Sequence, residues 1–278
     1  MFRQVYFVRR IFIPHCIEAW KRLHLFKAFE SGFFGKHVIN CCLLDRNKKL
    51  PVCFDDQMPI TKKTQARSLK ECILKCMLLT DEKLRGMNYM PSGSCSCFSI
   101  ASLRYNVSTK LVASGCRSYV NHDCPERFDY VVEQHRCYKM QFQLLNWYDA
   151  RSLCNSISHS HPISIDDDQE NVESLEYVNI TAPNYQVCPI TGFTDIYAFY
   201  TSGISTYFSG VRTPFLWFPY PGIYKNVQST SAWHSSEPNS IADGSDNCIQ
   251  SILLGYFGWN DAPCTWLMCV LCEFDMKI

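Results

Sequence analysis

The sequence carries little excess charge and no long apolar run. Its 27 basic and 26 acidic residues leave a net charge of +1, whereas a nucleic-acid partner requires a concentrated basic surface that can neutralise phosphates. No stretch approaches the roughly 20 apolar residues that a membrane-spanning helix needs. We therefore set aside nucleic acid as a partner and expect no membrane span.

The sequence also lacks the motifs of common enzyme classes. It contains no nucleophile elbow, no His-Glu-x-x-His segment and no glycine-rich loop of the kind that cradles phosphates. Zinc-ribbon spacing is missing too, because Cys269 and Cys272 have no second Cys-x-x-Cys pair nearby. We predict that the chain is not an enzyme and that its cysteines do not form a zinc site.

Cysteine is abundant instead. The 17 cysteines among 278 residues indicate disulfides made in the secretory route, since a reducing cytosol would keep them as thiols. Asn106-Val-Ser108 and Asn179-Ile-Thr181 are glycosylation sequons, which agree with that route. We predict a secreted, extracellular protein. Because 17 is odd, at least one thiol is free or links two chains into an oligomer.

The first 40 or so residues fit this compartment poorly. Basic residues interrupt every apolar stretch that a signal peptide would need, and the best candidate, Ile11–Ile17, contains Pro14 and His15. We interpret residues 1–40 as a poorly defined leader or an incorrectly assigned start. No fold is predicted for them.

The length of the chain and its 47% hydrophobic content predict two modest domains. The turn-rich segment Asn121–Pro125 is typical of a domain boundary. We therefore expect a small disulfide-rich domain over residues 41–122 and a second domain over residues 123–278, both of the α+β class.

In the first domain, the order Ser68-Leu-Lys-Glu71 is a capping box and predicts a helix over about Leu69–Leu79. One face of this helix carries two cysteines, and two further cysteines share one face of a later strand. Two disulfides can join the elements, although spacing alone does not prove the connectivity. We predict the pairs Cys72–Cys97, Cys76–Cys95 and, closing the ends, Cys53–Cys116.

This helix-to-strand arrangement over roughly residues 50–120 resembles a PAN or apple module. The alternative is a generic small disulfide domain.

The second domain begins with a predicted hairpin between Cys124 and Cys137, in which Phe128, Tyr130 and Val132 alternate. A helix follows, whose inward face carries three residues at helical spacing: Trp147, Ala150 and Cys154.

A second helix is predicted after the acidic cluster Asp166–Asp168, with Asp167 and Glu170 as its capping box. We interpret the cluster as a cap rather than a metal site. The expected inner face of this helix is Val172, Leu175 and Val178.

Three motifs near the C-terminus carry the chemistry: Glu237-Pro238-Asn239, Asp246-Asn247-Cys248 and Trp259-Asn260-Asp261. Together with the cysteines and the Trp147 helix, they resemble a long-form C-type lectin-like domain over residues 124–275. The resemblance implies two helices, small antiparallel sheets and a long loop region. It also implies three disulfides: Cys124–Cys137, Cys154–Cys272 and Cys248–Cys264.

Cys188 and Cys269 have no standard partner in that family and could pair with each other. Three further cysteines stay unassigned: Cys16, Cys41 and Cys42.

Calcium takes six to eight oxygen ligands in proteins. Five side chains offer such oxygens, and we predict that they bind one Ca²⁺ ion and a carbohydrate together: Glu237, Asn239, Asp246, Asn260 and Asp261. The family resemblance implies a cis bond before Pro238. Because no acid lies between Phe215 and Ser236, no auxiliary calcium site is expected.

The order Glu-Pro-Asn resembles the family members that prefer mannose-like and glucose-like sugars, which makes glycans or glycoproteins the expected partners. The alternatives are that these residues are ordinary polar loop residues, or that the domain binds protein without calcium.

Two further expectations concern the core. The family's central strand corresponds best to residues Tyr207–Val211, which leaves Thr181–Thr206 as an insertion. Trp147, Trp233 and Trp259 are expected to pack in the core or under loops rather than to stack on sugar.

Overall fold

The computed structural model describes residues 7–8, 39–41, 43–44, 51–57, 61–101, 105–108, 110–131, 134–182, 188–190, 193–209, 211–228, 232–239, 245–252 and 258–276. Most of residues 1–40, the predicted leader, lies outside these ranges. The chain forms two compact units, Met1–Cys137 with Met276–Ile278, and Tyr138–Asp275. The division falls after Cys137 because Tyr130 of the predicted hairpin is buried in the core of the first unit, beside Phe54 and Phe98.

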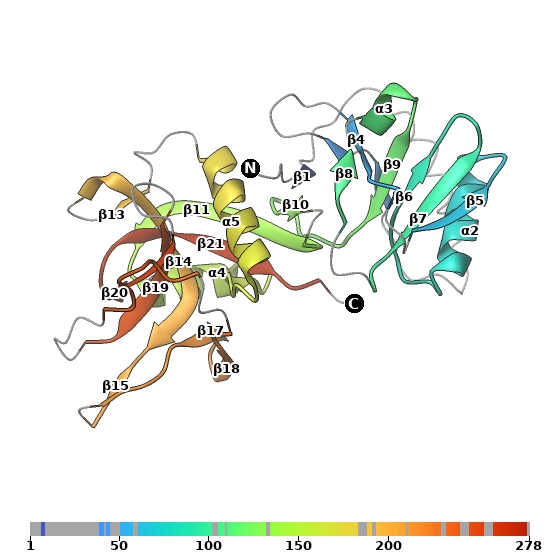
Figure 1. The fold of residues 1–278 in the computed structure, drawn as a ribbon. Helices are drawn as coiled ribbons and strands as arrows, with labels where there is room; N and C mark the ends of the chain where they lie inside the picture. The colour runs from blue at the N-terminus through green and yellow to red at the C-terminus, as the bar shows by residue number, and fades with distance from the viewer. Residues whose placement is uncertain are drawn as a thin grey trace. The chain divides into compact units, whose positions relative to one another are not determined.

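The first unit is built mainly of short strands (Figure 1). In chain order its elements are β1 (Phe7–Val8), β2 (Ile39–Cys41), β3 (Leu43–Leu44), β4 (Pro51–Phe54), β5 (Lys62–Gln65), α2 (Leu69–Leu79), β6 (Leu84–Tyr89), β7 (Ser94–Ser99), β8 (Val107–Ser108), α3 (Lys110–Ala113), β9 (Arg117–Asn121) and β10 (Asp129–Val131). Five of the strands form an antiparallel sheet in the order β2-β9-β6-β7-β5. Helix α2 packs against β5, β6 and β7 of this sheet.

Helix α2 begins where the capping box predicts. The Ser68 hydroxyl accepts a hydrogen bond from the Glu71 amide at 3.2 Å, and the Glu71 carboxylate accepts one from the Arg67 amide at 2.8 Å. These bonds satisfy amides that a helix start leaves without partners. Cys72 and Cys76 are the fully buried side chains of the helix.

The predicted pairing of these two cysteines was wrong. The structure joins Cys72 to Cys95 and Cys76 to Cys97, the reverse of the prediction. The start of α2 lies near the end of β6, where the Cys72 sulfur is 4.0 Å from the Asn88 carbonyl oxygen. Strand β7 then reverses β6, so that β7 runs in the same direction as α2 and the earlier cysteines of the two elements meet. The outer pair, Cys53–Cys116, is present as predicted.

His135 in the first unit gives a prediction about acid stability. Burial of the imidazole lowers its pKa to about 3, and the nearby positive charges of Arg85 and Arg136 act in the same direction. Its Nδ1 lies 2.7 Å from the Tyr130 hydroxyl. An unfolded chain has the ordinary pKa of 6.5, so it binds the proton first as the pH falls. The stability that a neutral His135 contributes is therefore complete above pH 6.5 and is lost progressively below it.

Between pH 7 and pH 5 we expect His135 to remove about 2 kcal/mol from the unfolding free energy of the first unit. The measurement is hydrogen exchange of the core amides of β6 and β7 over this pH range. In the matched variant His135→Asn, this loss should disappear, and Asn also tolerates the positive φ of 54° found here. Equal pH dependence in the variant would contradict the prediction.

The second unit contains the longer elements. They are β11 (Arg136–Leu145, which begins at the boundary), α4 (Trp147–Ser156), β12 (His161–Pro162), α5 (Asp168–Thr181), β13 (Pro189–Ile190), β14 (Phe193–Ser205), β15 (Tyr207–Phe208), β16 (Val211–Arg212), β17 (Leu216–Tyr220), β18 (Ile223–Asn226), β19 (Asn247–Ile252), β20 (Gly258–Pro263) and β21 (Met268–Phe274). Strand β14 is central: it pairs antiparallel with β17 and β19 and parallel with β21. Figure 1 shows α4 and α5 beside this group of strands.

The predicted central strand was also wrong. Tyr207, Phe208 and Val211 lie in the small β15–β16 pair of strands. The central strand is Phe193–Ser205, within the segment interpreted as an insertion. Strand β14 contains a glycine, Gly203, at a position where a neighbouring strand leaves no room for a side chain. A Cβ atom there would lie 2.5 Å from Cδ1 of Ile249, so glycine lets β19 pack closely.

Both helices of the second unit begin at a capping side chain, and the cap of α5 is the predicted one. Asn146 caps α4, and Trp147, Ala150 and Cys154 are fully buried, as predicted. Asp167 caps α5 by accepting a hydrogen bond from the Glu170 amide at 2.9 Å.

The inner face of α5 differs from the prediction. Leu175 and Val178 are buried, but the Val172 side chain is 40% exposed. Each three-residue step falls about 60° short of a full turn, so a row of residues at i, i+3 and i+6 drifts around the helix. The buried face includes Ser174 and Tyr177 instead.

Disulfides and aromatic side chains stabilise the second unit. It contains Cys154–Cys272, Cys188–Cys269 and Cys248–Cys264, while Cys124–Cys137 lies in the first unit. The side chains of Cys16, Cys41 and Cys42 lie outside the described residues.

Trp147 and Trp259 are fully buried, as expected for core residues. The indole nitrogen of Trp147 donates to the Thr201 carbonyl oxygen at 2.9 Å, and that of Trp259 donates to the Asn171 side chain at 2.9 Å. Among the described helices, none is long and apolar enough to cross a membrane.

Candidate functional site

The candidate site lies where the loop after Trp233 meets strand β20. Trp233 forms a parallel bridge with Trp259, and the two segments exchange backbone hydrogen bonds. The His234 amide donates to the Trp259 carbonyl oxygen at 3.0 Å, and the Trp259 amide donates to the Ala232 carbonyl oxygen at 2.7 Å. The backbone therefore holds the Glu237-Pro238-Asn239 motif close to the Trp259-Asn260-Asp261 motif.

Three of the five predicted ligands come together. The main-chain nitrogen of Asn239 lies 2.9 Å from a carboxylate oxygen of Glu237 and 2.9 Å from a carboxylate oxygen of Asp261. The Asn239 side-chain nitrogen donates to the other Glu237 oxygen at 3.0 Å. The Glu237–Pro238 peptide bond is cis, as the resemblance implies. The two carboxylates thus meet at the main-chain N–H of Asn239, and the Asn239 side chain lies against Glu237.

The electrostatics of this cluster favour a cation. Burial raises the pKa of Glu237 above its ordinary value, and the charge of Asp261 raises it further, while the hydrogen bond from Asn239 acts in the opposite direction. Two carboxylates this close repel each other unless a positive charge lies between them. The donor set therefore fits a hard divalent ion such as calcium, which prefers carboxylate and amide oxygens.

The structure brings in a residue that the prediction omitted. The Asn247 side-chain nitrogen lies 2.5 Å from the second carboxylate oxygen of Asp261. Asn247 is fully buried, and its side-chain oxygen has no hydrogen-bond partner among the described residues. A buried oxygen in this state is costly, and a bound ion or water would satisfy it.

Asp246 is directed elsewhere. One of its carboxylate oxygens accepts a hydrogen bond from the Tyr148 hydroxyl, and the other accepts one from the Tyr207 amide at 3.2 Å. Consecutive residues of an extended chain point to opposite sides, so only one of Asp246 and Asn247 can face Asp261. The sequence predicted Asp246 because it carries a carboxylate, whereas in the structure it is the Asn247 side chain that contacts Asp261.

Asn260 is separated from the cluster for the same reason. It lies beside Asp261 in β20 and pairs across the strands with Gln250, whereas Asp261 pairs with Ile249. Asn260 is half-buried, and within the described part of the chain no hydrogen bond joins its side chain to Glu237 or Asn239.

No protein-family model matches the chain. The chain is 27% identical to "C-type lectin 1" of Hydrophis hardwickii over 177 residues, which cover 62% of the chain and 89% of that protein. It is 24% identical to the "C-type lectin mannose-binding isoform" of Notechis scutatus scutatus over 152 residues, covering 54% of the chain and 82% of that protein. These relatives support a C-type lectin-like domain in the chain.

Among solved structures, the C-type lectin CEL-I from Cucumaria echinata superimposes with a TM-score of 0.42 and 17% sequence identity. The superposition covers 56% of this chain and 99% of that protein.

Proposed function

We propose that the second unit is a calcium-dependent carbohydrate-binding domain with one calcium site. The convergence of Glu237, Asn239 and Asp261 is the observation that carries this proposal. The two snake relatives support it at the level of the family. The proposal describes a binding protein and assigns no catalytic role.

The proposed ligands are of two kinds, charged and neutral. Glu237 and Asp261 supply the negative charge, and the side-chain oxygens of Asn239 and Asn247 add neutral ligands. Asp246 and Asn260 complete the predicted set only after their side chains rotate from the positions described above. A bound calcium ion would supply open coordination positions for two adjacent sugar hydroxyls. The carboxylates then accept, and the asparagine amides donate, hydrogen bonds at those hydroxyls.

The proposed sugar class is mannose-like or glucose-like. The order of donors and acceptors in Glu237-Pro238-Asn239 supports it, since it decides which arrangement of hydroxyl pairs is matched. The relatives do not decide the sugar class, because the one from Notechis scutatus scutatus is named as mannose-binding and one from Pseudechis porphyriacus, also 24% identical, as galactose-binding. Because the site lies partly in a loop, we expect a calcium dissociation constant of about 10⁻⁴ to 10⁻³ M, as in other extracellular modules.

A glycan array run with calcium and again with chelator tests the proposal. Mannose-terminated glycans should bind in about 10 mM calcium and not in EDTA. With a dissociation constant near 1 mM, the same calcium should raise the unfolding free energy of the second unit by about 1.4 kcal/mol. If EDTA changes neither glycan binding nor thermal stability, the proposal fails.

One observation favours a second candidate, a calcium-independent protein-binding module. Both carboxylates of the cluster already accept hydrogen bonds from its own side chains, because the Asn239 side-chain nitrogen donates to Glu237 and the Asn247 side-chain nitrogen donates to Asp261. As such a module, the second unit would bind a protein partner through this surface without an ion. Binding of a glycoprotein that persists in EDTA and after enzymatic removal of its glycans would identify this function.

Several predictions from the sequence join the proposal. Secretion is supported by the disulfides, and glycosylation is supported by the exposure of Asn106 and Asn179. The first unit is proposed to be a PAN or apple-like module, on the support of the two disulfides between α2 and β7. An odd number of cysteines supports assembly through an intermolecular disulfide.

A further inference from the structure

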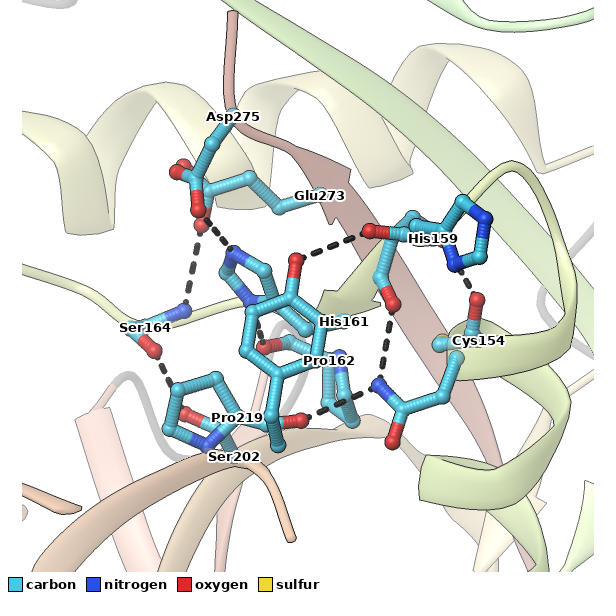
Figure 2. A network of polar contacts seen from close by, with 12 residues as sticks. Cys154, His159, His161, Pro162, Ser164, Ser202, Pro219, Glu273 and Asp275 are labelled. Carbon is cyan, nitrogen blue, oxygen red and sulfur yellow. Dashed lines mark hydrogen bonds and ion pairs between the residues drawn. The ribbon is translucent and has the colours of Figure 1, made fainter. Parts of the chain in front are cut away.

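A second cluster of metal-ligating side chains lies in the same unit and shares no residue with the calcium site. His161, Glu273 and Asp275 each offer one ligand atom, and these atoms lie within 4.8 Å of one another. His161 in β12 pairs directly with Glu273 in β21, and Asp275 follows at the end of that strand. Figure 2 shows the three side chains pointing toward one another.

The surroundings hold two of the three ligands firmly. His161 and Glu273 are each only 1% exposed. The Ser164 amide donates to a Glu273 carboxylate oxygen at 3.2 Å, and the Ser164 hydroxyl lies 2.7 Å from that of Ser202 (Figure 2). Asp275 is different, because 47% of its side chain is exposed. The cluster is therefore preorganised on the protein side and reachable from solvent at Asp275.

The hydrogen bonds of His161 determine which ring nitrogen carries a lone pair. Its Nδ1 lies 2.7 Å from the Pro162 carbonyl oxygen. A carbonyl oxygen can only accept, so Nδ1 carries the hydrogen. In the neutral ring, Nε2 is then an acceptor, and it lies 3.1 Å from a carboxylate oxygen of Asp275. Two acceptors at that separation need a positive species between them, either a proton or a metal ion.

We propose that His161, Glu273 and Asp275 form a binding site for a transition-metal ion of the zinc type. An imidazole nitrogen with two carboxylates is a donor set that such ions accept. Bonds of 2.0–2.1 Å in a tetrahedral arrangement separate two ligand atoms by about 3.3 Å, close to the 3.1 Å between His161 and Asp275. A backbone carbonyl that fixes the histidine tautomer is the usual outer partner of a metal-bound histidine. The open side at Asp275 leaves room for a water ligand.

Zinc titration of the full-length protein tests this site. Free thiols are first alkylated, because they would bind zinc, and the buffer contains about 10 mM calcium so that the calcium site is filled. Calorimetry should show one zinc ion per chain. In Asp275→Asn, zinc affinity should fall by more than about tenfold. The matched control Asp81→Asn, at an exposed aspartate of the first unit, should bind zinc as the unaltered chain does.

A measurement that needs no variant separates the metal from a proton. In ¹⁵N-labelled protein, the Nε2 resonance of His161 should shift on addition of zinc, while Nδ1 keeps its hydrogen. A His161 spectrum unchanged by excess zinc would mean that a proton alone joins the side chains, and it would overturn the proposal. Full zinc affinity in Asp275→Asn would overturn it as well, even if that variant is less stable. Neither result bears on glycan binding.

Discussion

Asp261→Asn is expected to abolish calcium-dependent glycan binding, whereas Asp246→Asn is expected to leave most of it. Asp261 is only 2% exposed, and its two carboxylate oxygens contact Asn239 and Asn247. Removing its charge takes away half of the carboxylate charge at the centre of the cluster. Because changes to outer partners alone cost about 10- to 100-fold in metal affinity, loss of this ligand should weaken calcium binding by at least about 100-fold.

Asp246 is the matched control because it is also an aspartate that the sequence places in the ligand set. Its carboxylate contacts Tyr148 and Tyr207 instead of the cluster, so its substitution should change calcium affinity by less than about tenfold. The measurement is calcium titration followed by calorimetry, with mannose binding as the second readout. Equal losses in the two variants would mean that Asp246 rotates into the site when the ion binds, and that the sequence-derived ligand set was the correct one.

The comparison of these two aspartates shows what sequence can predict about this site. Short motifs predicted which segments meet, because Glu237 and Asp261 do converge. The motifs could not predict which side chain of a neighbouring pair faces inward. That choice depends on strand register, since a shift of one residue moves every side chain to the other face. The contact between Asn247 and Asp261 could therefore be found only from the pairing of β19 with β20.

The fold shows the same division between local and non-local information. Both capping boxes were read correctly, because a cap depends on residues within one turn of each other. The order of the Cys72 and Cys76 disulfides was missed because it depends on how α2, β6 and β7 reverse direction. The central strand β14 was missed because a glycine in its interior argues locally against a strand. The reason for that glycine is the packing of Gly203 against Ile249, which lies 46 positions along the chain.

Removal of the Cys154–Cys272 disulfide is expected to destabilise the second unit more than removal of Cys248–Cys264. The first joins residues 118 apart and the second joins residues 16 apart. Because Cys188–Cys269 stays closed in both variants, the loop that Cys154–Cys272 closes is shortened to about 37 residues. In the chain-entropy description, a longer closed loop restricts the unfolded chain more, which corresponds to about 4 and about 3 kcal/mol respectively. Replacing each pair by alanine keeps the comparison matched, since all four sulfur sites are nearly or fully buried.

Tryptophan fluorescence during urea unfolding measures this difference in the intended unit, because five of the six tryptophans lie between residues 138 and 275. The variant that lacks Cys154–Cys272 should unfold at a lower urea concentration than the variant that lacks Cys248–Cys264. The opposite order would mean that the shorter disulfide acts mainly on the folded state.

Cys248 follows Asn247 directly, and the main-chain amide of Cys264 donates a hydrogen bond to the Asp246 carbonyl oxygen at 3.1 Å. If the opposite order is found, loss of Cys248–Cys264 should also weaken calcium binding. The strands that carry Asn247 and Asp261 would then no longer be held in register.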